Sequence, residues 1–163
     1  MDDDTPTAFE RHDHAACREA ALAGARAACA ERGLRLTPVR QRVLEILLEE
    51  HAALGAYDVL RRLTDEGAGP QPPVAYRALD FLVANGFAHR IERLNAYVAC
   101  TCPGEGHVAA FLICRGCGTV AETHAPALSE TIRAQADALG FRIETPVVEI
   151  GGTCAGCAAA EGA

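Results

Sequence analysis

Two pairs of cysteines, each with two residues between its members, constrain the fold of this chain more than any other feature. The pairs are Cys114-Arg115-Gly116-Cys117 and Cys154-Ala155-Gly156-Cys157. Each pair presents two thiolates to one ion from a tight turn, and two pairs complete the tetrahedral four-sulfur site typical of structural zinc. Residues 118–153 separate the pairs, so the chain between them must fold back to bring the second pair to the first.

The alternative for these cysteines is a set of redox dithiols or of sulfurs packed separately into a core. Two such closed turns with a glycine inside each seldom arise by accident, which favours the metal site. Four thiolates leave no open coordination position, whereas a catalytic zinc keeps one for water or substrate. The zinc is therefore expected to stabilise a small unit with a marginal core and to take no part in catalysis.

The chain shows no pattern typical of export or of insertion into a membrane. It begins with the acidic run Met1-Asp2-Asp3-Asp4, and no apolar stretch approaches about 20 residues, the length that crosses a bilayer. We therefore expect a cytoplasmic protein without a membrane partner. Because the cytoplasm is reducing, its eight cysteines favour metal binding over a disulfide framework.

The net charge of −7 argues against nonspecific binding to nucleic acids, which requires clustered positive charge. The charge is unevenly distributed, however. Residues 31–93 carry nine arginines and nine acidic residues, whereas the segments before and after them are acidic. All 15 basic residues are arginines, whose forked guanidinium suits contacts with phosphate and guanine; the alternative explanation is a bias of genome composition. By its balance of charges, the segment 31–93 is the least acidic part of the chain.

Four helices and a hairpin are predicted in the first hundred residues. The helices span His14–Arg32, a segment that begins at Thr37-Pro38, Ala56–Glu66 and Val74–Asn85, and the strands span Phe87–Glu92 and Ala96–Cys100. Thr37 supplies an N-cap hydroxyl, and the proline after it suits the first helical position. Asn95 is the expected turn residue between the strands. Helices followed by a hairpin are typical of a winged helix-turn-helix.

A linker is predicted at residues 102–106, where two glycines and a proline occur within five positions. Beyond it we expect strands at Val108–Ile113 and Thr119–Glu122, a helix at Pro126–Leu139 and a strand at Phe141–Ile150. The expected fold class is α+β, with an N-terminal winged helix-turn-helix domain at residues 1–102 and a small α/β zinc-containing domain at residues 103–163.

A second group of potential metal ligands is scattered along the chain. Its members are His89, Cys100, His107 and Glu122. They lie on the two strands of the hairpin, at the end of the linker and after the first cysteine pair. No spacing rule joins them, and residue types alone favour surface histidines and a solvated glutamate. Three further residues lie close enough in sequence to compete as ligands: Cys102, Glu105 and His124.

Several motifs give the chain from about Leu34 to Cys157 a family resemblance. They are Arg35-Leu36-Thr37-Pro38-x-Arg40, Ala56-Tyr57-Asp58, Pro72-Pro73-x-x-Tyr76-Arg77-Ala78-Leu79-Asp80-Phe81-Leu82, Gly86-Phe87-x-His89, Tyr97-Val98-x-Cys100, and His107 followed seven residues later by Cys114-x2-Cys117-Gly118. In these motifs the chain resembles the ferric uptake regulator family, and within it the zinc-sensing branch of zinc uptake regulators. The resemblance extends over roughly three quarters of the chain.

The resemblance implies a zinc-responsive transcriptional repressor that binds double-stranded operator DNA as a zinc-loaded homodimer and controls zinc uptake genes. The domain at residues 1–102 would bind DNA, and the domain at residues 103–163 would dimerise. Each protomer is expected to bind two Zn²⁺ ions. The structural ion is expected at Cys114, Cys117, Cys154 and Cys157, and the regulatory ion at His89, Cys100, His107 and Glu122.

The helix predicted at Val74–Asn85 is expected to enter the major groove of DNA. Tyr76 and Arg77 lie near its N-terminus, where recognition helices contact base edges and phosphates. Three arginines before it are expected to contact the DNA backbone: Arg35, Arg40 and Arg42. Residue types alone would favour a packed Tyr76 and a solvated Arg77, so these roles depend on the resemblance.

Five residues depart from the family pattern or have no assigned role. The family usually carries Thr or Ser where this chain has Val74, which cannot donate a hydrogen bond to a phosphate, so one backbone contact is expected to be missing. The others are His12, His14, Cys17 and Cys29. A disordered tail and helix packing are their expected explanations.

Two other functions are the alternatives to zinc-dependent repression. An iron- or peroxide-sensing regulator of the same family would use nitrogen and oxygen ligands, whereas this chain offers the softer thiol of Cys100. A zinc hydrolase would use Glu122 as general base toward a zinc-bound water. No motif for an oxyanion hole or a substrate pocket accompanies these ligands, so the chain is not expected to be an enzyme.

Overall fold

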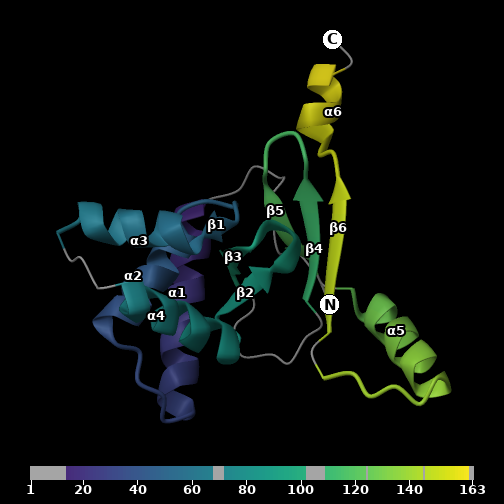
Figure 1. Ribbon diagram of the computed structural model, residues 1–163, viewed down its shortest axis with the longest axis horizontal. Coiled ribbons are helices and arrows are strands. Elements are labelled where there is room, and N and C mark those ends of the chain that lie inside the picture. Colours follow the sequence, from purple (N-terminus) through teal and green to yellow (C-terminus); the bar gives the residue numbers. More distant parts are fainter. Residues whose placement is uncertain (1–13, 68–71, 102–108, 124, 145, 162–163) are drawn as a thin grey trace.

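The computed structural model describes residues 14–67, 72–101, 109–123, 125–144 and 146–161. It consists of a helical part with a small sheet, built from residues 14–101, and a second part with a longer sheet, built from residues 109–161 (Figure 1). Each sheet has three strands, in the orders β1-β3-β2 and β5-β4-β6. The architecture confirms the predicted α+β class. No helix among the described residues is both long and apolar enough to span a membrane.

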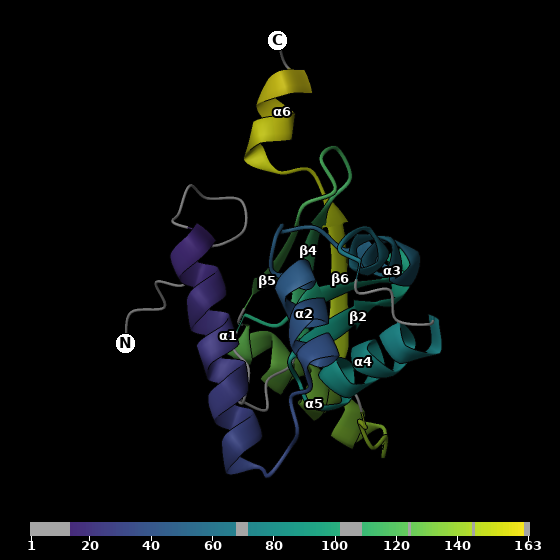
Figure 2. The ribbon, with the colours of Figure 1, turned by 90° about the vertical axis from the view of Figure 1, so that its left-hand side faces the viewer.

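Four helices build the core of the first part. They are α1 (His14–Glu31), α2 (Pro38–Leu47), α3 (Ala56–Asp65) and α4 (Pro72–Ala84). The hydroxyl of Thr37 accepts a hydrogen bond from the Arg40 N–H at 3.4 Å, which confirms the predicted cap of α2. Fully buried side chains such as Leu44 and Leu79 pack between the helices, and α1 lies along their outside (Figure 2).

The first sheet is the predicted hairpin with one short strand added. Strands β2 (Ala88–Ile91) and β3 (Ala96–Ala99) are antiparallel, and β1 (Leu54–Gly55) pairs with the other side of β3. A 3-10 turn, η1 (Glu92–Leu94), joins β2 to β3 and ends at Asn95, whose φ of 46° is left-handed. Asn tolerates this conformation better than most residues, so the predicted turn residue is confirmed.

The second sheet places a parallel strand at its edge. Its central strand β4 (Ala109–Cys114) is antiparallel to β5 (Val120–Thr123) and parallel to β6 (Val147–Gly152). The helix α5 (Pro126–Ala138) connects β5 to β6, and a short helix α6 (Ala155–Glu161) follows β6. The predicted strand from Phe141 is wrong at its start, because β6 begins only after Pro146, which has no N–H to donate to a ladder.

The two parts meet through an apolar cluster. Ile91 and Val98 of the hairpin are buried against three side chains of the second sheet: Phe111, Ile113 and Val120. The Val120 N–H also donates to the His51 carbonyl at 2.9 Å, beside an isolated bridge between residues 52 and 119. The boundary predicted near residue 103 lies outside the described residues. The buried cluster shows that the hairpin rests on the second sheet.

Candidate metal sites and nucleic-acid interface

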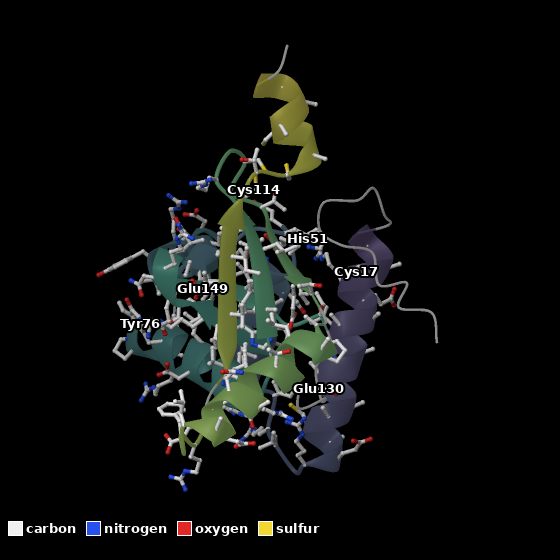
Figure 3. All side chains as sticks on the ribbon, turned by 90° about the vertical axis from the view of Figure 1, so that its right-hand side faces the viewer. Cys17, His51, Tyr76, Cys114, Glu130 and Glu149 are labelled. Atoms are coloured by element: carbon white, nitrogen blue, oxygen red, sulfur yellow. The ribbon has the colours of Figure 1, made fainter. Side chains whose placement is uncertain are left out.

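Four cysteine sulfurs converge at one end of the second sheet, below α6 (Figure 3). All four lie within 4.8 Å of one another, and the Sγ atoms of Cys117 and Cys154 are 3.9 Å apart. Cys114 ends β4 opposite Gly152 of the parallel strand β6, so the second pair follows directly from the strand beside the first. Zinc–sulfur bonds of about 2.3 Å place the sulfurs of a tetrahedral site about 3.8 Å apart. The four thiols therefore fit a zinc ion.

The surroundings of these sulfurs already favour thiolates at the first pair. Backbone N–H groups of Cys117 and then Cys154 lower the pKa of Cys114 from 9.0 to about 6. The Thr119 hydroxyl, 3.1 Å from the Cys117 sulfur, lowers the pKa of that thiol too. Hydrogen bonds to the Cys154 sulfur, and then to the other two, raise the pKa of Cys157 to about 12. Four crowded sulfurs ionise together only beside a cation, and zinc provides that charge.

Gly116 makes room for the fourth sulfur. A Cβ atom at this position would lie 2.8 Å from the Cys157 Sγ and 3.1 Å from its Cβ. At the corresponding position of the second pair, Gly156, the nearest described atom would be the Cys154 Sγ at 4.0 Å. Only the first of the two glycines is therefore required by close packing.

A second group of ligand atoms lies between the two sheets. His89 belongs to β2, Cys100 follows β3, and Glu122 belongs to β5; their ligand atoms lie within 4.8 Å of one another. The His89 Nε2 is 3.1 Å and the Cys100 Sγ 3.9 Å from the Glu122 Oε1. Only 3% of the Glu122 side chain and 1% of Cys100 are exposed. Imidazole, thiolate and carboxylate are all zinc ligands, so this donor set also fits zinc.

The other carboxylate oxygen of Glu122 is held by the residue after Cys100. The backbone N–H and the hydroxyl of Thr101 donate to Glu122 Oε2 at 2.8 and 2.9 Å. This leaves Oε1 directed at His89 and Cys100. Hydrogen bonds of this kind orient metal ligands. The role of Thr101 was not predicted, because nothing in its local sequence connects it with β5.

The structure brings together three of the four predicted regulatory ligands. The fourth, His107, lies outside the described residues, as do its three competitors Cys102, Glu105 and His124. Of the unassigned residues, His12 lies outside them as well, and His14 is the first residue of α1. Cys29 is buried in the helical core, which confirms its expected packing role. Among the described residues, neither Cys17 nor Cys29 belongs to a ligand cluster.

An open hollow between α2 and α4 collects part of the predicted DNA contacts. It has a volume of about 190 Å³ and is lined by Thr37, Val39, Arg40, Val74, Arg77 and Ala78. The Arg40 guanidinium lies 3.6 Å from the centre of the Phe81 ring and donates to the Arg35 carbonyl at 2.6 Å. Tyr76, the next predicted contact, is 40% exposed. The hollow is thus lined by two cationic side chains, Arg40 in the first turn of α2 and Arg77 in the first half of α4.

Two residues of α2 and α3 differ from what the sequence indicated. Tyr57, at the start of α3, is 79% exposed and received no role, although an exposed tyrosine is a frequent contact residue. Arg42 instead forms ion pairs with three glutamates: Glu45 on α2, Glu49 just after α2 and Glu66 just after α3. A phosphate near Arg42 would meet these carboxylates, so the structure does not favour its predicted DNA contact.

Several known proteins are similar to this chain in both sequence and architecture. The model of the ferric uptake regulator family matches residues 31–150. The chain is 39% identical over 141 residues to the zinc uptake regulation protein of Escherichia coli strain K12, which covers 86% of this chain and 82% of that protein. A solved structure of a zinc uptake regulator complexed with zinc and DNA superposes with a TM-score of 0.84 at 37% identity, over 90% of this chain and 98% of the other.

Two further structures share one source protein and differ in state. The structure described as holo XcZur superposes with a TM-score of 0.78 at 39% identity, over 90% of this chain and 99% of the other. The structure described as apo XcZur reaches only 0.51 at 37% identity, over 86% and 97%. From the match over most of its length, this chain belongs to the ferric uptake regulator family.

Proposed function

We propose that this chain is a zinc-responsive transcriptional repressor that binds operator DNA as a homodimer and controls genes of zinc uptake. The observation that carries this proposal is the convergence of His89, Cys100 and Glu122 from both sheets onto one point. The similarity to the Escherichia coli zinc uptake regulation protein and to the complex with zinc and DNA supports the same function.

The four-cysteine cluster is the proposed structural zinc site. A bound zinc ion would supply a tetrahedral junction between the end of β4 and the start of α6. Cys114 and Cys117 come from one side of this junction, and Cys154 and Cys157 from the other. Because all four positions are taken by thiolates, the site would contribute folding free energy and no catalysis.

The second cluster is the proposed sensing site. His89 and Cys100 come from the hairpin of the helical part, whereas Glu122 comes from the second sheet, and we propose His107 as the fourth ligand. A metal held by ligands from both parts would favour the arrangement in which the parts are closed, because an open arrangement separates the ligands. The TM-scores of 0.78 with the holo form and 0.51 with the apo form of one relative support this view.

The helical part, residues 1–102, is the proposed DNA-binding domain. Helix α4 would enter the major groove, with Tyr76 and Arg77 exposed near its first turn. Arg40 lines the same hollow as Arg77, and Arg35 is fixed beside it through its carbonyl. We add Tyr57 as a further contact from α3. The function also requires the cytoplasm as the compartment, because the operator is there.

The second part, residues 103–163, is the proposed dimerisation domain. Of the residues of α5, all of which the structure describes, only Ala136 is buried. Leu139 and Phe141 after this helix are 83% and 65% exposed, and Val147 and Ile150 of β6 are nearly half exposed. Strand β6 is hydrogen-bonded to β4 and to no other described strand. An edge strand beside exposed apolar side chains is a surface that a second copy of the chain would cover.

No enzymatic activity is proposed for either cluster. The four thiolates leave no position for a substrate, and four protein ligands at the sensing site would leave none there. The donor set also favours zinc over iron, since the thiolate of Cys100 is softer than the oxygen and nitrogen ligands that iron prefers. A zinc repressor is therefore favoured over a hydrolase and over an iron or peroxide sensor.

The test compares the parent protein with Cys100→Ala and with Cys17→Ala as the matched cysteine control. Zinc per protomer is measured after removal of free metal, and anisotropy follows binding to a labelled duplex selected from a random library by the zinc-loaded protein. We expect two zinc ions and zinc-dependent binding in the parent and in Cys17→Ala, but one zinc and lost response in Cys100→Ala. Equal zinc content and equal metal dependence in all three proteins would sink the sensing site. A stronger response to Fe²⁺ or Mn²⁺ would replace zinc as the signal.

A further inference from the structure

We propose that Glu149 and Gly151 on β6 form a second contact between the two parts of the chain, which needs no metal and positions the DNA-binding part on the dimerisation part. The contact seats the hairpin turn η1 on the edge strand β6, and we call it the wing latch: Glu149 and Gly151 on β6 with Glu92 and Arg93 on η1. The inference rests on the proposed function in one respect, because it takes the closed arrangement as the one that binds DNA.

Glu149 holds the backbone of the turn with both carboxylate oxygens. Its Oε1 accepts the Glu92 N–H at 2.7 Å, and its Oε2 accepts the Arg93 N–H at 3.2 Å. Glu149 is half-buried, and Figure 3 shows it at the middle of β6. Hydrogen bonds to a charged acceptor are stronger than neutral ones, and a pair of them fixes orientation as well as distance. The turn is therefore held through main-chain N–H groups, which any substitution in η1 other than proline leaves in place.

The Arg93 side chain packs against the backbone of Gly151. A Cβ atom at Gly151 would lie 2.5 Å from the Arg93 Nη1 and 3.2 Å from its Cζ, so the guanidinium occupies the space of the missing side chain. Residues 149 and 151 are two apart on one strand and face the same side of the sheet. The carboxylate and the glycine thus form one surface that receives the backbone and the side chain of the same turn.

The wing latch and the sensing cluster lie at opposite edges of the second sheet. The strand order is β5-β4-β6, with Glu122 on β5 and Glu149 on β6. Neighbouring strands are about 4.8 Å apart, so the two edges are separated by roughly 10 Å. Strand β2 extends across this width, with His89 near its start and η1 directly after its end. Between the two contacts lie the buried side chains of Ile91 and Phe111.

Two separated contacts fix an orientation that one contact leaves open to rotation. A metal at the β5 edge alone would leave the hairpin free to pivot about it, whereas the wing latch fixes the other edge. Both contacts favour the same closed arrangement, so they are coupled thermodynamically: loss of the latch weakens zinc binding at the sensing cluster and DNA binding together. The four-cysteine site, whose ligands lie outside this contact, is unaffected.

The test removes the latch in two independent ways. Glu149→Ala deletes both acceptors, Glu149→Gln keeps one neutral acceptor, and Gly151→Ala displaces the Arg93 guanidinium while leaving Glu149 intact. Glu144→Ala is the control, because Glu144 is an exposed carboxylate that pairs only with Arg142 among its described neighbours. Hydrogen exchange of the Glu92 and Arg93 amides is measured in the zinc-loaded protein, and the free zinc at half-maximal binding is measured with the labelled duplex defined above.

In Glu149→Ala, the two amides are expected to exchange faster, and the zinc midpoint is expected to rise about tenfold, the size of losing a charged hydrogen-bonded contact. Glu149→Gln and Gly151→Ala should give smaller shifts in the same direction, and Glu144→Ala should match the parent. Unchanged exchange at both amides in a folded Glu149→Ala dimer would overturn the latch; if that variant does not fold, Glu149→Gln decides by the same measurement, because it removes one of the two acceptors. Faster exchange without any zinc-dependent DNA binding in the parent would contradict the proposed function and leave the latch established.

Discussion

At the scale of single residues, Gly116 carries the strictest steric demand at the metal sites. Its missing Cβ leaves the space taken by the Cys157 sulfur, which would otherwise lie 2.8 Å away. We expect Gly116→Ala to push this sulfur from its position and to weaken zinc binding at the four-cysteine site about 10- to 100-fold, as changes beside zinc ligands do. Competition with a chromogenic chelator measures the affinity, and thermal unfolding reports the accompanying loss of stability.

The matched control is Gly156→Ala, which changes the corresponding position of the second pair. A Cβ there would be 4.0 Å from the nearest described atom, the Cys154 Sγ, and Gly156 lies in α6, where alanine is the better helix former. Zinc affinity should therefore equal that of the parent. If both substitutions weaken zinc binding alike, general damage to the turns and not the contact with Cys157 is responsible.

How far single residues could be predicted depends on whether their role is local. The four cysteines were found because two sulfurs of a zinc turn are close in sequence, and their spacing is itself the signal. The roles of Thr101, Glu149 and Gly151 were missed. Each depends on a partner more than 20 residues away, Glu122 for the first and the turn η1 for the other two. No periodicity or spacing records such a contact before the chain has folded.

At the scale of elements, the first turn of α4 lacks a hydrogen-bond donor in its side chains. Val74 lines the hollow beside Arg40 and Arg77 and is half-buried. We expect Val74→Thr to increase operator affinity about threefold, because its hydroxyl can donate to a phosphate at nearly unchanged shape, and a neutral hydrogen bond contributes about 0.5–1.5 kcal/mol. Anisotropy with the selected duplex at saturating zinc measures the change.

Val74→Ala is the control for this gain, since it shortens the side chain without adding a donor. Its operator affinity should equal or fall below that of the parent. A neutral hydroxyl releases no counterions, so the salt dependence of binding by Val74→Thr should keep the slope of the parent. An equal gain in both variants would assign the effect to relief of crowding in the hollow.

The elements were predicted best where a periodic pattern meets a clear end signal. Helix α2 begins after Thr37, and the hairpin turns at Asn95, as the cap and turn residues indicate. Strand β1 was missed because two residues, Leu54–Gly55, carry no pattern and become a strand only by pairing with β3. The start of β6 was misplaced, because the apolar pattern from Phe141 continues through Pro146 although its pairing with β4 does not.

At the scale of the whole molecule, a net charge of −7 is compatible with binding to DNA because the charges are segregated. Arg42 and Arg62 form ion pairs with glutamates on α2 and just after it: Glu45, Glu49 and Glu50. Arg40 and Arg77 instead line the hollow, where the described lining contains no acidic residue. The net charge of the whole chain therefore does not describe the charge around the hollow.

The exposed apolar residues of the C-terminal part predict that the chain forms a dimer. Phe141 is 65% exposed, and the N–H that follows α5 at this residue is already fixed to the Ala136 carbonyl at 2.8 Å. Phe141→Asp should thus leave the local backbone intact and place a charge on the surface proposed for the second copy. Loss of an aromatic residue at the centre of an interface costs about 2 kcal/mol or more, so we expect the dimer dissociation constant to rise at least about 30-fold.

Sedimentation velocity over a range of concentrations measures the dimer dissociation constant. Tyr57→Ser is the control for dimerisation, because Tyr57 is 79% exposed but lies on α3, far along the chain from the proposed interface. The monomer formed by Phe141→Asp should retain the zinc of the four-cysteine site, since those ligands all come from one chain. It should also bind the selected duplex more weakly, because a single recognition helix then contacts one half-site. A monomeric parent, or a Phe141→Asp dimer as stable as the parent, would place the dimer contact elsewhere and leave the exposed surface around α5 without the partner assigned to it.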